Sequence, residues 1–235
     1  MLQQTPVARV LPAYERFLGR FPTLAALRRA RLGDVLVAWG GLGYPRRARD
    51  LHRVARSVRS LPRDPAALDL LPGIGRYTAS AVACFTWGAP VAFADTNIRR
   101  VLGRVVLGRT ATEREAIAID ADLMARRRAD TWHHALMDLG ATICVSRAPR
   151  CDRCPLFDPC VAKGRDAAPA VRRQAAFATS DRRVRGAIMR TLRERGPLAV
   201  DQLLARVADA RAPRLLEALR SEGLLVVRRG RAALP

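Results

Sequence analysis

Apolar residues recur at helical spacing along most of this chain. Segment 5–21 carries one at every third or fourth position, which predicts an amphipathic helix. The same spacing predicts further helices at about 23–30, 33–40, 45–60, 65–71, 75–87, 96–107, 113–128 and 130–142. The alternating pattern of strands is nearly absent before residue 160. We therefore expect an all-helical body.

The pattern changes after residue 163. Residues 164–181 are rich in Ala, Arg and Pro without clear periodicity, which is typical of a linker. Helices are predicted beyond it at about 182–195, 199–208 and 212–222. They precede an apolar run, Leu224–Val227, a turn at Arg228–Arg231 and a second short apolar run. Three short helices and a hairpin predict a small winged-helix-like module.

The charge balance points to an anionic partner. The 235 residues include 42 Lys and Arg against 21 Asp and Glu, a net charge of +21, and Lys163 is the only lysine. Nucleic acid is the commonest partner for such a surplus; an arginine-favouring genome is the alternative explanation. The chain has neither a signal-peptide pattern nor an apolar run of membrane-spanning length. We therefore expect a soluble cytoplasmic protein associated with the nucleoid.

Four cysteines lie close together in the sequence. Cys144, Cys151, Cys154 and Cys160 are spaced C-x6-C-x2-C-x5-C, so four thiolates could surround one metal centre. Disulfides are improbable in a reducing cytoplasm, which leaves a [4Fe–4S] cluster or a tetrahedral zinc ion. Cys84 is interpreted as a core thiol.

Basic residues stand between these cysteines. Arg147, Arg150 and Arg153 would be held in fixed geometry against a phosphate backbone if the loop were ordered around a metal. The alternative is a solvated basic loop.

Two further features carry candidate chemistry. The segment Leu71–Gly75 has glycines at 73 and 75, which permit a tight turn followed by a helix N-terminus able to bind phosphate; an ordinary helix–helix connection is the alternative. Asp95 directly precedes a predicted helix, where an N-cap is its usual role. A carboxylate fixed there could also stabilise the cation that forms as a glycosidic bond breaks.

Taken in order, Leu71–Gly75, Asp95 and the four-cysteine loop resemble the endonuclease III superfamily of helix-hairpin-helix glycosylases. Met1–Thr5, Gly41–Tyr44 followed by Arg47 and Ala48, and Met137–Ala141 look like its adenine DNA glycosylase branch. The match covers about residues 1–163. It implies a [4Fe–4S] cluster on the four cysteines, and a fold of helical barrel domain (1–109) and helical cluster domain (110–163). A linker (164–181) and the winged-helix-like module (182–235) would follow.

The resemblance also assigns roles to single residues. Asp95 would stabilise the sugar cation, and Asn97 would help to order the active site. Gly73 and Gly75 would grip phosphate. Gln3 and Gln4 lie in the motif that contacts DNA, where Gln4 and Tyr44 would fill the space left by a flipped adenine.

Tyr77 argues against strand cleavage. In the branch that also nicks DNA, the matching position holds a lysine, whose amine attacks the sugar. A Schiff base needs an amine, and the only lysine of this chain lies beyond the cysteines. We therefore expect a monofunctional enzyme.

The match departs from the family at both ends. The branch has a catalytic glutamate two residues before the methionine of Met1–Thr5, and the sequence begins at that methionine. General acid help is worth about 10²–10⁴-fold, so the chain as written should be impaired unless its reading frame extends upstream; a stop codon close upstream would contradict that extension. The C-terminal module is too short for the domain that reads 8-oxoguanine in many members. It could add phosphate contacts or be a structural cap.

The function expected from the sequence is excision of adenine mispaired with 8-oxoguanine or guanine, by a monomer bound to duplex DNA. Two alternatives remain. One is a thymine or uracil glycosylase on the same scaffold, against which Gln3 and Gln4 argue. The other is a non-catalytic iron–sulfur regulator that binds a defined DNA sequence.

Overall fold

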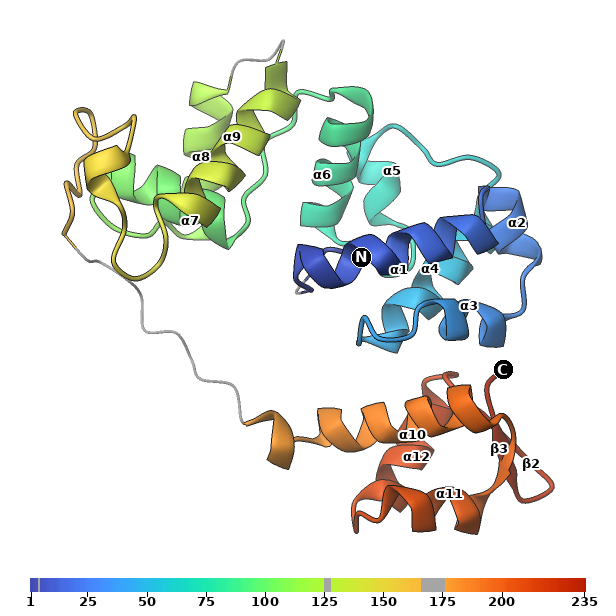
Figure 1. Cartoon of the computed structure of the whole chain (residues 1–235). Helices are drawn as coiled ribbons and strands as arrows, with labels where there is room; N and C mark the ends of the chain where they lie inside the picture. Colours follow the sequence, from blue (N-terminus) through green and yellow to red (C-terminus); the bar gives the residue numbers. More distant parts are fainter. Residues whose placement is uncertain (4, 125–127, 166–175) are drawn as a thin grey trace. The chain divides into compact units, whose positions relative to one another are not determined.

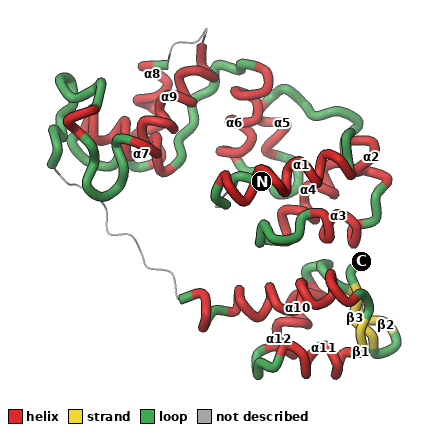
Figure 2. The backbone as a smooth tube through the Cα atoms, in the orientation of Figure 1, coloured by secondary structure: helices red, strands yellow, loops and turns green. Residues whose placement is uncertain are grey.

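The computed structural model describes residues 1–3, 5–124, 128–165 and 176–235. The chain forms two compact units, one of Met1–Leu61 with Arg173–Pro235, and one of Pro62–Arg172. Each unit has a hydrophobic core of its own. Figure 1 follows the elements along the chain, and Figure 2 shows that helices dominate both units. The expected all-helical body is confirmed.

Four helices form the N-terminal part of the first unit. They are α1 (Val7–Arg20), α2 (Leu24–Arg29), α3 (Leu32–Ala38) and α4 (Pro45–Ser57). The amphipathic pattern of α1 buries Val10, Ala13 and Phe17, and the Phe17 ring meets the Trp39 ring edge-on at 6.0 Å. The Thr23 hydroxyl accepts from the Ala26 amide and so caps α2.

The C-terminal part of this unit is a winged-helix module. Its elements are α10 (Asp181–Arg195), β1 (Leu198–Ala199), α11 (Val200–Val207), α12 (Ala212–Ser221), β2 (Val226–Arg228) and β3 (Arg231–Ala233). The strands form an antiparallel sheet in the order β1-β3-β2. The predicted module is confirmed, although β1 is too short, at two residues, to show an alternating pattern.

This module packs against α3 and α4. The Gly33 amide donates to the Pro235 carbonyl at 2.6 Å, and a Cβ at position 33 would lie 2.5 Å from that oxygen. Glu222, which follows α12, accepts paired hydrogen bonds from Arg46 of α4 and from Arg185 of α10. The two arginines lower the pKa of Glu222 to about 2. One carboxylate therefore joins the module to the N-terminal helices.

The second unit contains the helices that carry the sequence-predicted chemistry. They are α5 (Pro65–Asp69), α6 (Arg76–Trp87), α7 (Thr96–Leu102), α8 (Glu113–Leu123) and α9 (Ala129–Thr142). Helix α5 packs against α6, and α7 packs against α9. A capping box between Thr112 and Glu115 begins α8. The predicted helix 113–128 ends at Leu123, and residues 125–127 lie outside the described residues.

The predicted helix over 96–107 changes type partway. It is α-helical to Leu102 and continues as a π-helix over Gly103–Leu107. A Cβ at Gly103 would lie 2.2 Å from the Ala111 nitrogen, because the following loop folds back to bond the Arg99 carbonyl through that nitrogen. This close backbone approach across the helix could not be predicted from apolar spacing.

The domain boundaries predicted at residues 109, 163 and 181 stay predictions, and residues 166–175 of the predicted linker lie outside the described residues. A short 3₁₀ turn, Phe177–Thr179, precedes α10. Among the residues described, no helix combines the length and apolar character needed to span a membrane.

Replacing Glu222 by Gln should destabilise the first unit. The carboxylate is held by two guanidinium groups, and charge-assisted bonds of this kind contribute about 1–2 kcal/mol in total to the free energy of unfolding. Its lowered pKa means that this stability is present above the ordinary glutamate pKa and is lost as the pH falls toward about 2. Urea unfolding of the parent and of Glu222→Gln should therefore show a stability gap at neutral pH that narrows below about pH 4.3 and closes toward about pH 2.

Glu217→Gln is the matched control. Glu217 is 55% exposed and pairs with Arg220 of its own helix, so its replacement should change the urea midpoint far less. Equal losses in the two variants would contradict the joining role of Glu222.

Candidate active site and cysteine pocket

Asp95 is the N-cap of α7. Its Oδ1 atom accepts hydrogen bonds from the Asn97 and Ile98 amides, both at 2.8 Å. Its other oxygen, Oδ2, accepts from none of the residues that the structure describes. The side chain is half-buried. Both interpretations of Asp95 from the sequence are therefore compatible, because capping uses one oxygen and leaves the second available.

Tyr77 lies beside this carboxylate. It stands in the first turn of α6, and burial followed by the Asp95 charge raises the pKa of its phenol. Its ring meets the Phe93 ring edge-on at 5.6 Å. The structure therefore brings together two of the predicted catalytic residues, with a phenol that stays neutral at physiological pH.

Arg100 fixes the first turns of α7 to the end of α9. Its Nη2 donates to Asn97 Oδ1 at 2.8 Å and to the Gly140 carbonyl at 2.6 Å, and its Nε donates to the Cys144 carbonyl at 2.7 Å. A Cβ at position 140 would lie 2.7 Å from the Asn97 Cβ. Asn97, predicted to order the site, therefore packs closely against a glycine of the Met137–Ala141 motif.

The hairpin between α5 and α6 has the predicted form. Gly73 has a φ of +74°, a conformation that favours glycine. Gly75 is the N-cap of α6, where no side chain caps the helix. Apart from its chain neighbours, nothing lies within 4 Å of the position that a Cβ at Gly75 would occupy. These features suit a phosphate at the start of α6, the helix that carries Tyr77.

Tyr44, predicted to fill the space left by a flipped adenine, lies in the first unit. Tyr44 is 41% exposed, and its backbone is left-handed, with a φ of 45°. The Arg47 guanidinium lies 4.4 Å from the Tyr44 ring centroid and also donates to the Gln3 carbonyl. Arg47 thus brings Gln3 and Tyr44 together, whereas Gln4 lies outside the described residues.

Three contacts hold the loop that presents Tyr44. The Thr5 hydroxyl and the Arg9 guanidinium donate to the carbonyls of Leu42 and Gly41, respectively. The Trp39 indole donates to the Gly43 carbonyl at 3.0 Å. These three contacts therefore fix the loop, while Tyr44 itself stays exposed.

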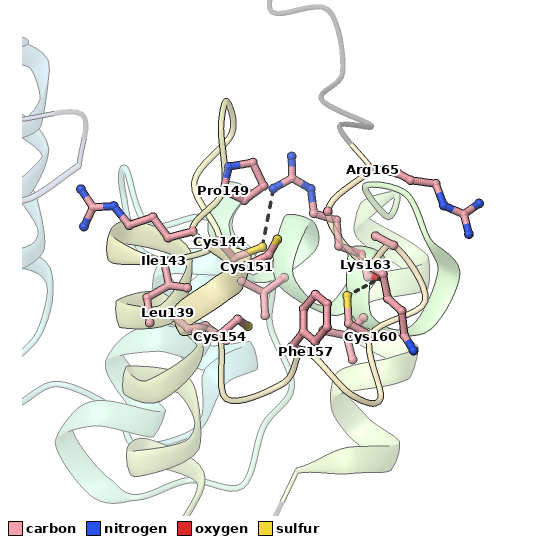
Figure 3. Close-up of a pocket in the computed structure, with 16 residues that line it drawn as sticks. Leu139, Ile143, Cys144, Pro149, Cys151, Cys154, Phe157, Cys160, Lys163 and Arg165 are labelled. Atoms are coloured by element: carbon pink, nitrogen blue, oxygen red, sulfur yellow. Dashed lines mark hydrogen bonds between the residues drawn. The ribbon is translucent and has the colours of Figure 1, made fainter.

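The four clustered cysteines line one pocket that is partly open to solvent. Figure 3 shows Cys144, Cys151, Cys154 and Cys160 along its wall, with Leu139, Ile143 and Phe157 beside them. Burial, followed by the proximity of the other three thiols, raises the pKa of Cys151. As placed, no group of three or more His, Cys, Asp or Glu among the described residues is arranged to hold a metal ion.

Arg104, from the π-helical segment, lines the pocket. It is 3% exposed, and it donates to the carbonyls of Val145 and Ser146 and, at 3.6 Å, to Cys144 Sγ. The wide π turn also lets the Arg104 and Val105 carbonyls accept from the Ala162 and Val161 amides. A buried cation donating to a sulfur suits a centre ligated by thiolates, so the residues fit such a group.

Arg147 and Arg150 are exposed on the loop between the first two cysteines. The Arg150 amide donates to the Ile143 carbonyl at 2.9 Å, which closes that loop onto the end of α9. Arg153 is exposed too, 3.9 Å from Asp152. All three arginines are exposed, and Arg150 also lines the cysteine pocket.

Residues 1–125 match the model of the HhH-GPD superfamily base excision DNA repair proteins. The match spans more than half of the chain, and it includes the hairpin, Tyr77 and Asp95. The chain belongs to this superfamily. The resemblance inferred from sequence motifs is therefore confirmed.

Several curated relatives are named adenine DNA glycosylase. Adenine DNA glycosylase of Mycolicibacterium smegmatis is 43% identical over 240 aligned residues, which cover 96% of this chain and 81% of the relative. The protein of that name from Mycobacterium tuberculosis H37Rv is 42% identical and covers 100% and 83%. The human protein of that name is 38% identical, but the match covers 70% of this chain and 32% of the relative.

Solved structures of the superfamily share the fold. A trapped endonuclease III–DNA covalent intermediate aligns with a TM-score of 0.62 at 24% identity, covering 69% of this chain and 79% of that one. A thermostable thymine-DNA glycosylase aligns with a TM-score of 0.59 at 26% identity, with the same coverage. The predicted helix-hairpin-helix glycosylase fold is confirmed.

Sequence reasoning missed two groups of site residues. The sequence analysis gives Arg100 and Arg104 no role, yet both are buried and donate to carbonyls at the start of the cysteine loop. His133 was given no role, although it pairs with Asp120 in the core at 2.8 Å. The available signal was weak: arginines four apart on one helical face, and a histidine in an apolar helix.

Gly140→Ala should loosen the contact between α7 and α9. The new methyl would lie 2.7 Å from the Asn97 Cβ and 3.3 Å from the Val101 Cγ2, and overpacking of this kind costs about 1–3 kcal/mol of unfolding free energy. Urea unfolding followed by circular dichroism should show the loss. Gly186→Ala is the control, because position 186 lies inside α10 with nothing within 4 Å, and alanine should stabilise that helix slightly. An unchanged midpoint for Gly140→Ala would contradict the tight packing.

Proposed function

We propose that this protein excises adenine mispaired with 8-oxoguanine or guanine from duplex DNA, as a monofunctional DNA glycosylase. Relatives named adenine DNA glycosylase match it over nearly its full length. The superfamily is one of base excision repair proteins. These two findings favour adenine over the thymine or uracil alternative.

The geometry of Asp95 carries this proposal. The N-terminus of α7 fixes Oδ1 through two amides. Oδ2 is left to face the deoxyribose, where it would stabilise positive charge as the bond from C1′ to adenine breaks. Water then adds to C1′, and an abasic site and free adenine are the products.

Tyr77 limits the reaction to hydrolysis. A phenol beside Asp95 cannot form a Schiff base with C1′, because that bond requires an amine. Lys163, the only lysine, lies in the wall of the cysteine pocket rather than beside Asp95. Strand cleavage through a lysine adduct is therefore not part of the proposed reaction.

Several surfaces would bind the DNA. Gly73, Gly75 and the first amides of α6 would hold one phosphate, and Arg147 and Arg150 would hold others. Tyr44, exposed on its fixed loop, would enter the base stack when the adenine leaves it, with Gln3 next to it through Arg47. Gln4 is proposed for the same role from its sequence match alone.

Cys144, Cys151, Cys154 and Cys160 would hold a [4Fe–4S] cluster. Four thiols on one pocket wall match the ligand number of such a cluster, and the Arg104 guanidinium offsets their negative charge. The cluster, when bound, supplies structural order to the loop that carries Arg147 and Arg150. A zinc ion is the competing occupant.

Asp95→Asn should abolish adenine excision while mismatch binding is retained. Asparagine caps helices about as well as aspartate, so α7 should still begin at residue 96, but the charge that stabilises the sugar cation is gone. Under single-turnover conditions we expect a loss on the order of 10²–10³-fold or more. Duplexes with A:8-oxoguanine, A:G, T:G and U:G pairs should be tested side by side, and release of thymine or uracil alone would contradict the choice of base.

Asp64→Asn is the matched control. Asp64 caps α5 through the Ala66 and Ala67 amides, so the same substitution probes capping without the proposed chemistry. Its excision rate should stay within a few-fold of the parent rate. Equal losses in the two variants would mean that Asp95 acts only as a cap.

The occupant of the cysteine pocket can be measured directly. Protein purified without oxygen should contain about four iron and four sulfide per chain, and Cys154→Ser should lose most of both. Cys84→Ser is the control, because Cys84 is fully buried elsewhere in the same unit. One zinc per chain with no sulfide would contradict the cluster and favour the alternative.

A further inference from the structure

A buried carboxylate of α8 is surrounded by hydrogen-bond donors. Asp120 is 0% exposed. Its Oδ1 accepts from the Trp132 indole nitrogen at 2.6 Å. Its Oδ2 accepts from the Phe93 amide at 3.1 Å and lies 2.8 Å from His133 Nε2. The carboxylate thus joins α8, two residues of α9 and the segment that leads into α7.

The His133 ring is held at both nitrogens. Nδ1 lies 2.7 Å from the Ala129 carbonyl, and a carbonyl can only accept, so Nδ1 carries a proton. Nε2, the other ring nitrogen, lies 2.8 Å from Asp120 Oδ2. The ring also stacks on Phe93, with centroids 4.0 Å apart and planes at 12°.

Phe93 is therefore fixed at its backbone and on its ring. It is 2% exposed, and the edges of Tyr77 and Phe85 pack against it at 5.6 and 5.7 Å. Only Ala94, itself buried, separates Phe93 from Asp95. Displacement of the Phe93 amide would move the residue that precedes the α7 N-cap.

We propose that Asp120 is a positioning residue for Asp95, acting through the Phe93 amide and through His133. This inference rests on the proposed function, since it assigns Asp120 a part in the excision step. Asp120 touches neither the sugar nor the base. It sets the register of residues 93–95, which places Asp95 Oδ2 and the Tyr77 ring relative to one another.

The donor pattern explains why an amide cannot replace this carboxylate. In Asp120→Asn, an amide oxygen turned toward Phe93 and His133 would leave the NH₂ group facing the Trp132 N–H. In the opposite rotamer, the NH₂ group would face the Phe93 N–H. In either rotamer, the NH₂ group therefore faces another N–H donor, with no acceptor between the two.

Removing the Trp132 donor should therefore rescue the amide. In the double variant Asp120→Asn/Trp132→Phe, the amide oxygen can accept from the Phe93 amide, while its NH₂ group no longer meets a donor. A structural defect without positioning would instead make the double variant worse than either single variant, because two buried groups would be lost.

The experiment compares the parent with Asp120→Asn, Trp132→Phe and the double variant in two measurements. The first is hydrogen exchange of the Phe93 amide. It should be about ten-fold faster in Asp120→Asn and close to the parent rate in the double variant. The second is the single-turnover rate of adenine excision at saturating protein, which does not depend on the folded fraction. It should fall by about ten- to a hundred-fold in Asp120→Asn and recover in the double variant, with mismatch affinity changed only a few-fold.

Two results would overturn the inference. One is an Asp120→Asn variant with the exchange and excision rates of the parent. The other is a double variant that is as impaired as Asp120→Asn. A double variant that fails to fold, as Asp120→Asn does, counts as this second result. A parent protein that excises no adenine contradicts the proposed function instead. The exchange measurement then still decides whether Asp120 holds Phe93.

Discussion

The N-terminus of α7 is the constraint on which the site depends. Two backbone amides converge on Asp95 Oδ1 and leave Oδ2 without a described donor. An exposed aspartate would sample several rotamers, and its charge would be solvated by water. At this helix end the two amides fix the direction of the carboxylate. Electrostatic stabilisation is strongest when such a group is oriented before the reaction begins.

The same helix connects this carboxylate to the cysteine pocket. Arg100, one turn beyond Asn97, donates to the carbonyls of Gly140 and Cys144. Arg104, one turn further, donates to the loop that follows Cys144. Both guanidinium groups are buried, and the hydrogen bonds that they donate to these carbonyls connect the helix to the loop. The loop between the cysteines therefore contributes to fixing α7, and through it to fixing Asp95.

Much of the fold could be predicted from the sequence because apolar spacing determines where helices form. The predicted helix over 5–21 forms as α1 at Val7–Arg20, and the predicted C-terminal module forms with its sheet. What apolar spacing misses depends on contacts between distant residues. The π-helical segment follows from the approach of Ala111 to Gly103, and β1 exists only because β3 pairs with it.

The site could be predicted only in part, for the same reason. Motifs located Asp95, Tyr77, Asn97 and the four cysteines, and the structure places the first three around the start of α7 and the last four around one pocket. The roles assigned to them stay predictions. The burial of Arg100 and the pairing of Asp120 with His133 could not be predicted, because an arginine-rich helix and a lone histidine most often face solvent or fill a core.

The most direct test of the account is the affinity of the protein for charged and neutral analogues of the reacting sugar. A duplex with a cationic pyrrolidine at the abasic position, opposite guanine, should be compared with one carrying neutral tetrahydrofuran there. Transition-state analogues bind more tightly than ground-state ones, so the parent should prefer the cation by about ten-fold or more, and Asp95→Asn should lose that preference. An equal preference in both proteins would contradict the role of Asp95.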